Sequence, residues 1–405
     1  MASPYTIMQS TAPGQVRWTQ GFFAQSFAAV AENTLASMRE ALETPGNAAQ
    51  WDNLYIAAGL KEGEFYGVNW SDGDCFKWME AVAHVYGATQ DPALDALLDE
   101  HIAVVAKAQD PDGYIGTHVQ LTDMERWSDR RHHELYNFGH LMTAAAAHHR
   151  VTGKNSFLAV AIKAADYLYD LFMPQPRELT HYAWNPSNIM GLIDLYRECG
   201  DRRYVDLADT FVSMRGAHSE DFVRPHSEMR SDQGDQNQDR VPLRDEDVAV
   251  GHVVTATYLY AGAADLYAET GETALLEALE RIWDDFVSKK MYVTGAGAAL
   301  HHGASERADF VHEAYGRPYE LPNASAYNET CANIGGAMWS WRLLGITGES
   351  KYADLMEQVI YNSMFSAANL DVTRFTYTNP LRWHGEEQVM MSNDRAERWF
   401  THHCY

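Results

Sequence analysis

Residues 267–272 have the sequence Tyr-Ala-Glu-Thr-Gly-Glu, and boundaries of this kind decide the fold because they recur along the chain. Each boundary ends an amphipathic helical stretch, turns within a few residues and continues with polar residues that can start another helix. In four of the five boundaries a glycine stands where the end of a helix needs a left-handed residue. The other boundaries lie at residues 85–92, 149–154, 196–201 and 344–349. Each boundary therefore predicts a helical hairpin.

Helical hairpins cannot bury both of their faces alone, so they must pack side by side. Helices expected around residues 23–41 bring the total to about six hairpins, and six hairpins that close on themselves make an (α/α)6 toroid. An open solenoid is the alternative arrangement. The irregular spacing of the hairpins and the long polar segments between them favour the closed ring, because solenoid repeats keep a tighter period. We therefore predict an all-α toroid in which residues 1–405 form a single domain.

Two segments do not fit the helical pattern. Residues 219–247 are rich in Asp, Gln, Arg and Asn and lack apolar periodicity, so we expect a loop there. A solvated, mobile insertion is the favoured interpretation, and a flap over a binding site is the alternative. Residues 370–381 alternate apolar and polar side chains, which predicts a short strand or hairpin near the C-terminal end.

The bulk composition limits the possible partners. The chain carries a formal charge of −25 and has a pI near 5.0, so a nucleic acid or an anionic membrane would be repelled. A neutral or weakly charged substrate fits better. No run of eighteen apolar residues occurs, and the N-terminus lacks a basic region before an apolar core. We therefore expect no membrane span and no secretory signal, and a cytoplasmic location.

The densest group of chemically useful residues lies between positions 312 and 332. Glu329 and Cys331 flank Thr330, so at the start of a helix their carboxylate and thiol could reach one metal ion. Glu313 lies sixteen residues before Glu329, across a loop that contains a proline, and could serve as a separate proton donor. A Glu-x-Cys sequence taken alone is more often a helix-start carboxylate beside a small buried thiol. The other cysteines, Cys75, Cys199 and Cys404, are too scattered for a disulfide scaffold.

Histidines form a second group of candidates. His133 and His140 are seven residues apart, so both can point inward from one helix face. A histidine on a core-facing helix is more often a hydrogen-bonded structural residue than a ligand. His148 and His149 are expected at a helix end, where an imidazole is structural. The many aromatic residues suit a sugar pocket and a large core equally.

Several motifs taken together resemble glycoside hydrolase family 127, the β-L-arabinofuranosidases. The matches occur in the family's order and span nearly the whole chain, with His312 where the family usually has Gly. The matching segments are residues 71–74, 77–80, 133–136, 251–253, 291–295, 313–316, 319–323, 327–332 and 375–381.

The resemblance implies a toroid that acts as a retaining exo-glycosidase, removing a terminal β-L-arabinofuranose or a related L- or deoxy-sugar from plant-type glycans. It implies a zinc-bound cysteine thiolate as nucleophile and a Glu as general acid and base. On this chain it assigns the acid/base role to Glu313 and two zinc positions to Glu329 and Cys331. The sugar contacts that it implies are His133, His140, His252 and Tyr377.

The resemblance breaks down at the nucleophile. The family has two adjacent cysteines shortly after a Trp-Phe pair, whereas here Trp399-Phe400 is followed by the end of the sequence at Tyr405. Cys404 looks like the cysteine that precedes the pair, or it is itself one of the pair in a divergent member, and it is a candidate zinc ligand. We therefore expect a truncated chain that lacks the nucleophile and the β-sandwich domains that follow the toroid in the family, and that binds Zn²⁺ weakly or not at all.

A second departure concerns the pocket wall. The family has a Gly-His-Gln-Glu segment near the position of residues 184–191, where this chain reads Trp-Asn-Pro-Ser-Asn-Ile-Met-Gly. The reaction type is therefore more firmly implied than the sugar. Two further hypotheses remain: a non-catalytic sugar-binding or scaffold toroid, and a metal-free toroid epimerase that uses histidines as acid and base. A homodimer is also left open.

Overall fold

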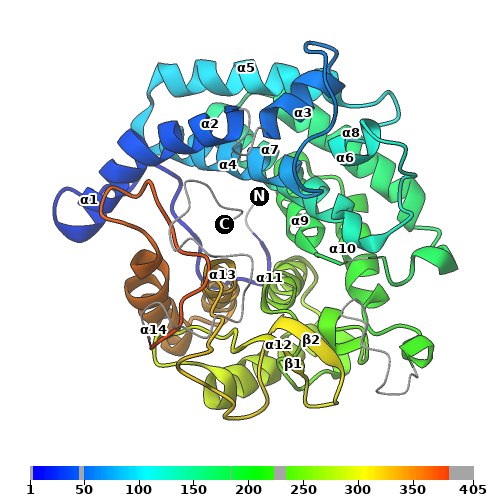
Figure 1. Ribbon diagram of the computed structural model, residues 1–405, viewed down its shortest axis with the longest axis vertical. Coiled ribbons are helices and arrows are strands. Elements are labelled where there is room, and N and C mark those ends of the chain that lie inside the picture. Colours follow the sequence, from blue (N-terminus) through cyan, green and yellow to red (C-terminus); the bar gives the residue numbers. More distant parts are fainter. Residues whose placement is uncertain (1–2, 45–49, 183, 223–233, 383–405) are drawn as a thin grey trace.

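The computed structural model describes residues 3–44, 50–182, 184–222 and 234–382, and these form a ring of helical hairpins (Figure 1). Successive inner helices pack against one another around the centre of the ring. The inner helices are α4 (Ser71–Thr89), α7 (Glu134–Thr152), α9 (Ser187–Cys199), α11 (Val253–Thr270) and α13 (Thr330–Thr347). The helices that follow them on the outside are α5 (Pro92–Ala108), α8 (Ser156–Phe172), α10 (Arg203–Met214), α12 (Thr273–Asp285) and α14 (Ser350–Val359).

The glycines at the hairpin boundaries end the inner helices as predicted. Gly153, Gly200, Gly271 and Gly348 follow α7, α9, α11 and α13, each with a φ between 70° and 77°. The fifth boundary uses a different residue, because Gly87 lies inside α4 and the left-handed cap is Gln90, with a φ of 59°. Each cap ends an inner helix and returns the chain to the outer layer. The inner helices therefore all run in the same direction along the axis of the ring.

The first and last hairpins meet, which closes the ring. The first hairpin contains α1 (Gly21–Ala29), a π-helical turn at Val30–Thr34, α2 (Leu35–Glu43) and α3 (Gln50–Ala57). Thr34 Oγ1 donates to the carbonyl of Val372 at 2.6 Å, and Asn33 donates to the carbonyl of Asp371. The ring of Phe22 lies 4.8 Å from that of Phe365. These contacts confirm the closed toroid and exclude the open solenoid.

The N-terminal segment crosses one end of the ring. The amide of Tyr5 donates to the carbonyl of Ala268 near the end of α11, and the amide of Ile7 donates to the carbonyl of Gly345 near the end of α13. Gly14 then lies against the backbone of Gly87 in α4. The segment therefore covers the C-terminal ends of the inner helices, and their N-terminal ends face the opposite side.

The main β structure lies at a place that the sequence did not indicate. A two-stranded antiparallel sheet is formed by β1 (Leu300–Ala304) and β2 (Phe310–Ala314). The β segment expected within residues 370–381 is limited to an isolated antiparallel bridge between Phe375 and Ala368 and does not extend into a longer strand. The β1–β2 hairpin was missed because its alternating pattern is interrupted by His301-His302-Gly303.

The described part of residues 219–247 is a loop, as predicted, but residues 234–239 within it are buried. It forms short 3₁₀ turns at Ser219–Phe222, Gly234–Asn237 and Leu243–Asp245, while residues 223–233 lie outside the described part. Residues 235–239 are all buried. The interpretation as a solvated insertion is therefore wrong for residues 234–239, because their polar groups are bonded to protein instead of water.

In the part of the chain that the structure describes, no helix combines the length and the apolar character that a bilayer crossing requires.

Two glycine substitutions test the conformational argument in opposite directions. Gly153→Ala forces a left-handed alanine at the end of α7, where the added methyl would meet open space, so we expect the free energy of unfolding to fall by about 1–2 kcal/mol. Gly336→Ala adds a methyl group in the interior of helix α13, also into open space. This substitution should raise the free energy of unfolding by about 0.5–1 kcal/mol. Urea unfolding of both variants measures the difference, and equal effects would contradict the cap assignment.

Candidate active site

The carboxylate of Glu313 lies at the centre of a polar cluster at the N-terminal ends of the inner helices. Its Oε2 lies 3.0 Å from Nε2 of His252, the residue that caps the start of α11. Its Oε1 accepts a hydrogen bond of 2.7 Å from the hydroxyl of Tyr327. Glu313 is on β2 and has a φ of 51°, which is uncommon for a residue other than glycine and is found most often at functional sites.

The neighbours of Glu313 favour its ionised form. Burial alone would raise the pKa of this carboxyl, but the hydrogen bond and charge of His252 and the hydroxyl of Tyr327 outweigh it and hold the pKa well below the ordinary value of 4.5. Glu313 and His252 are therefore a coupled pair, in which a proton can be held between two atoms 3.0 Å apart.

Glu329 and Cys331 lie at the start of α13 and are both buried. Tyr327, two residues before Glu329, donates its hydroxyl to the carboxylate of Glu313. Burial raises the pKa of the Tyr327 phenol, and the nearby charges of Glu329, Glu313 and Cys331 raise it further. Tyr327 is therefore bonded to the predicted acid/base residue and influenced by the charges of the two predicted metal ligands. Cys404, the further candidate ligand, lies outside the described residues.

The start of α13 is fixed by the segment that carries Tyr377. The amide of Thr330 donates to the carbonyl of Tyr377 at 3.0 Å, and its hydroxyl donates to the carbonyl of Thr376 at 2.8 Å. The side-chain amide of Asn379 donates to the carbonyl of Asn328 at 2.8 Å. The Tyr377 ring lies 6.3 Å from the Tyr327 ring, so this predicted sugar contact is beside the cluster.

Of the two histidines predicted on α7, His133 lies near Glu313 and His140 lies deeper. His133 caps α7, and burial lowers its pKa to about 4, with the charge of His252 lowering it and that of Glu313 raising it. His140 lies two turns further along α7, about 10 Å at 1.5 Å per residue. Its ring packs 4.4 Å from Tyr136 and 5.8 Å from Tyr258, inside the ring of helices.

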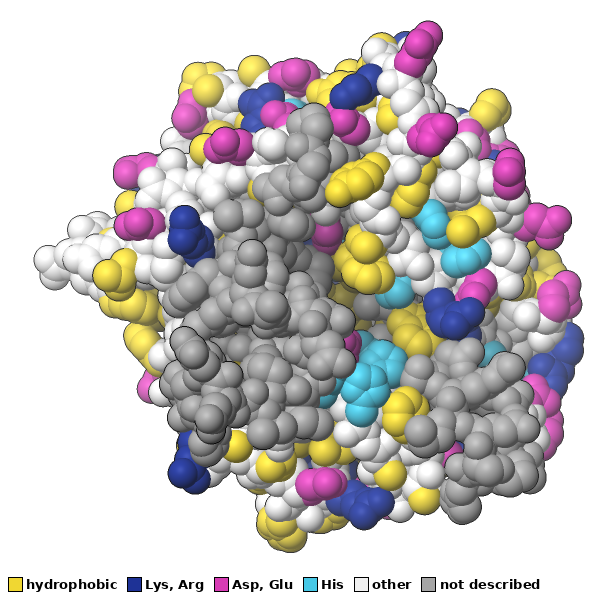
Figure 2. Space-filling model, viewed as in Figure 1, with side chains coloured by type: hydrophobic (Ala, Val, Ile, Leu, Met, Phe, Trp, Pro, Cys, Tyr) yellow, Lys and Arg dark blue, Asp and Glu magenta, His cyan; other side chains and the backbone are white. Residues whose placement is uncertain are grey.

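His312 is a site residue that the sequence alone did not indicate. Its ring lies 5.6 Å from His252 and 6.3 Å from Trp184, and burial followed by the charge of His252 lowers its pKa to about 4. Potential ligand atoms of His252, His312 and Glu313 lie within 4.8 Å of one another, a spacing that could hold a metal ion. Figure 2 shows histidine side chains gathered on this face near the β1–β2 hairpin. The only hint in the sequence was the exchange of the family's usual glycine for histidine.

Gln236 joins β2 to the segment that carries His252. Its Oε1 accepts the amide of His312 at 2.9 Å, and its Nε2 donates to the carbonyl of His312 at 3.2 Å. Its own carbonyl accepts the amide of His252 at 3.0 Å. Gln236 therefore bonds to both of the backbones that carry His252 and Glu313, which also pair directly through a bridge between His252 and Ala314.

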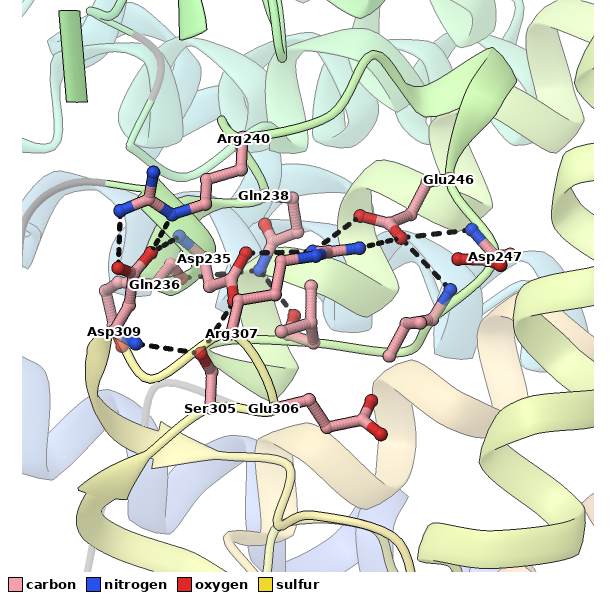
Figure 3. A network of polar contacts seen from close by, with 12 residues as sticks. Asp235, Gln236, Gln238, Arg240, Glu246, Asp247, Ser305, Glu306, Arg307 and Asp309 are labelled. Atoms are coloured by element: carbon pink, nitrogen blue, oxygen red, sulfur yellow. Dashed lines mark hydrogen bonds and ion pairs between the residues drawn. The ribbon is translucent and has the colours of Figure 1, made fainter. Parts of the chain in front are cut away.

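An ionic network keeps Gln236 in place (Figure 3). The carboxylate of Asp235 accepts from Ser305 at 2.6 Å and pairs with Arg307 at 2.9 Å, and Arg307 also pairs with Glu246 at 2.6 Å. Asp309 accepts the amide of Asp235 at 2.9 Å. Because Ser305, Arg307 and Asp309 form the turn between β1 and β2, the network ties the loop before α11 to the hairpin that carries Glu313.

Comparisons with known proteins agree with the fold. The sequence model for the catalytic domain of β-L-arabinofuranosidase, GH127, matches residues 15–404. The non-reducing end β-L-arabinofuranosidase of Bifidobacterium longum is 33% identical in an alignment of 345 residues that covers 81% of this chain and 51% of that protein. The crystal structure of a GH127 β-L-arabinofuranosidase from Geobacillus stearothermophilus T6 has a TM-score of 0.83 at 32% identity, over 92% of this chain and 59% of that one.

A further solved structure, described as a glycoside hydrolase, has a TM-score of 0.77 at 41% identity, over 95% of this chain and 56% of that one. The family model that matches is that of a glycoside hydrolase catalytic domain. The chain belongs to glycoside hydrolase family 127, which confirms the resemblance found in the sequence. It spans about half the length of the relatives that it matches, so the extent of the domain and the roles of the individual site residues stay predictions.

The low pKa of Glu313 predicts a pH dependence of stability. Because the pKa is lower in the folded chain than the ordinary 4.5, the ionised carboxyl stabilises the fold above about pH 4.5, and this contribution is lost as the pH falls further. Glu313→Gln removes the titrating group. We therefore expect the free energy of unfolding of the wild type to fall more steeply than that of the variant between about pH 5 and pH 3.

Chemical unfolding at a series of pH values measures this difference. Glu62→Gln, which changes an exposed residue after α3, is the matched control and should keep the wild-type profile. If the free energy of unfolding changed with pH in the same way for the wild type and for Glu313→Gln, the ionised carboxylate of Glu313 would not stabilise the fold.

Proposed function

We propose that this chain is the catalytic toroid of a retaining exo-glycosidase that releases terminal β-L-arabinofuranose, or a related L- or deoxy-sugar, from plant-type glycans. The observation that carries the proposal is the convergence of Glu313, Glu329 and Cys331 around Tyr327. Membership of family 127 and the two β-L-arabinofuranosidase relatives support the sugar class. The acidic chain also favours a neutral substrate.

In this proposal Glu313 is the general acid and base. A proton held on the Glu313–His252 pair passes to the leaving glycosidic oxygen in the first step, and Glu313 accepts a proton from water in the second. The low pKa keeps Glu313 ionised, which is the form that the second step requires. For the first step, the adjacent imidazole of His252 can return the proton when the leaving oxygen begins to accept it. The Tyr327 hydroxyl holds the carboxylate in position throughout.

Zinc would be held by Glu329 and Cys331. A carboxylate oxygen and a thiolate sulfur are both zinc ligands, and their burial at the start of one helix fits a structured site. Zinc, when bound, keeps a thiolate deprotonated at neutral pH. Cys404 is a further candidate ligand, and the resemblance to the family implies a cysteine nucleophile that we assign to no described residue.

The proposed sugar contacts are of two kinds. His133, His252 and Tyr377 surround the Glu313–Tyr327 pair and could bond to sugar hydroxyls. Burial keeps the imidazole of His133 neutral near pH 7, so it can both donate and accept. His140 is proposed as a contact at the bottom of the pocket, beneath Tyr136.

Glu313→Gln tests the acid/base role. We expect kcat of the full-length protein on an aryl β-L-arabinofuranoside to fall by about a hundred- to ten-thousand-fold, because proton transfer is lost. The loss should be greater for an aryl group that leaves poorly, since that group depends more on protonation. Glu320→Gln, an exposed carboxyl on the same loop system, is the control and should keep its activity. Full activity of Glu313→Gln would remove the assignment.

Metal analysis separates the proposal from its rivals. We expect about one zinc ion per full-length chain, lost in Cys331→Ser and kept in Cys75→Ser, which changes a buried free thiol in α4. Zinc retained in Cys331→Ser would contradict the proposed ligand. A metal-free epimerase would show no zinc and would convert a free sugar, and a non-catalytic toroid would bind sugar without releasing any.

A further inference from the structure

A cavity of about 360 Å³ lies at the opposite end of the ring from Glu313. The N-terminal segment forms one wall, and the C-terminal parts of α7, α9, α11 and α13 form the others. The cavity meets α13 from Trp341 onward, whereas the candidate active site begins at Glu329. Twelve residues of helix correspond to about 18 Å at 1.5 Å per residue, so the two sites are separate.

A rigid ionic frame supports this cavity. Arg197 bonds to Asp265 at 2.9 Å and to Glu269 at 2.7 Å, and Arg342 bonds to the other oxygen of Asp265 at 2.6 Å. The side chain of Asp265 is only 5% exposed. Because both arginines are held by a buried carboxylate, their guanidinium groups are fixed before any ligand arrives, which lowers the entropy lost on binding.

Two polar groups of the wall are not fully used by the protein. The carboxylate of Asp194 makes no hydrogen bond among the described residues, and its nearest cation is Nη1 of Arg197 at 3.8 Å. Burial and the charge of Asp265 raise the pKa of Asp194, as expected for a carboxylate without close partners. Arg342 uses Nε for Asp265 and Nη1 for the carbonyl of Met338, so its Nη2 remains available to a ligand.

The indole of Trp341 supplies an apolar surface beside these groups. Trp341 lines the cavity although 47% of it is exposed, which is unusual for so large an aromatic residue. Met8 of the N-terminal segment and Ile346 add further apolar surface. An exposed indole next to unused donors and acceptors forms a wall with both apolar and polar character.

The charges that line the cavity balance. Three cations, Arg150, Arg197 and Arg342, face three anions, Asp194, Glu198 and Asp265. An anion or a cation would therefore gain no net attraction there. A neutral polyhydroxy ligand fits instead, because each hydroxyl can donate to Asp194 and accept from Arg342, while the apolar face of a sugar ring packs on an indole. The volume also lies within the range of about 300–1,000 Å³ for small-molecule pockets.

We propose that this cavity is a second, non-catalytic carbohydrate-binding site, which holds a neutral sugar unit of the glycan whose end is cleaved at the other side of the ring. The choice of glycan rests on the proposed function, whereas the position and chemistry of the site do not. Trp341 provides the stacking surface, and Asp194 and Arg342 bond to the hydroxyls.

Isothermal titration calorimetry of the full-length protein tests the proposal. Neutral arabino-oligosaccharides are titrated into Glu313→Gln, so that the ligand is not consumed. We expect two binding events, and one of them should weaken by about ten-fold in Glu313→Gln/Trp341→Ala, because the stacking surface is lost. Trp18→Ala is the matched control, because Trp18 is also exposed but lies outside the cavity.

Asp194→Asn is a second variant that keeps the shape of the side chain. It should weaken the same event without changing the unfolding midpoint, which separates lost recognition from lost folding. Hydrolysis of a small aryl glycoside should be unchanged in Trp341→Ala, because that substrate reaches only the other end of the ring. If no glycoside is hydrolysed but the second event persists, the proposed function fails and the site stands.

Three outcomes would overturn the site. The first is a single binding event in Glu313→Gln. The second is an additional binding event whose affinity is the same in Trp341→Ala as in Trp18→Ala. The third is binding of inorganic phosphate that depends on Trp341 or Asp194, because it would show that the cavity selects an anion instead of a neutral sugar.

Discussion

The contact of the Glu313 carboxylate with His252 and Tyr327 is the constraint on which the candidate site depends. These residues come from β2, from the start of α11 and from the segment that leads into α13, so one carboxylate joins three parts of the ring. Family membership explains why a carboxylate is present at this place in a glycosidase. The contact with His252 and Tyr327 explains the local structure around that carboxylate. A buried carboxylate is stable only where partners compensate for its lost hydration, and the left-handed backbone of Glu313 aims it at both.

Gln236 and its neighbours make this geometry possible. A side-chain amide that bonds to both backbone groups of His312 acts as an added strand at the edge of β2. Gly251 is required beside it, since a Cβ there would lie 1.9 Å from the carbonyl of Asp235. Residues 234–252 therefore form a buried scaffold for the site. The polar side chains of these residues suggested exposure to water, but they form hydrogen bonds inside the protein.

The sequence predicted those features of the structure that depend on local chemistry. Gly153, Gly200, Gly271 and Gly348 marked the helix ends because a left-handed cap depends on the residue itself. The clustering of Glu313 with Glu329 and Cys331 was indicated by motif order. The places of Gln236 and His312 in the site were missed, because each depends on a partner more than sixty residues away in the chain. Periodicity within a window cannot report such contacts. The β1–β2 hairpin is local and was missed because its alternation is interrupted.

The closure of the ring also determines the order in which the protein can assemble. Thr34 bonds to Val372, and Tyr5 and Ile7 bond to residues 268 and 345, so the first hairpin and the segment before it have partners that are synthesised much later. Contacts so distant in sequence slow folding, and the apolar faces of the first helices remain uncovered until these partners arrive. The first hairpin is therefore the part of the toroid that is exposed to aggregation for the longest time during synthesis.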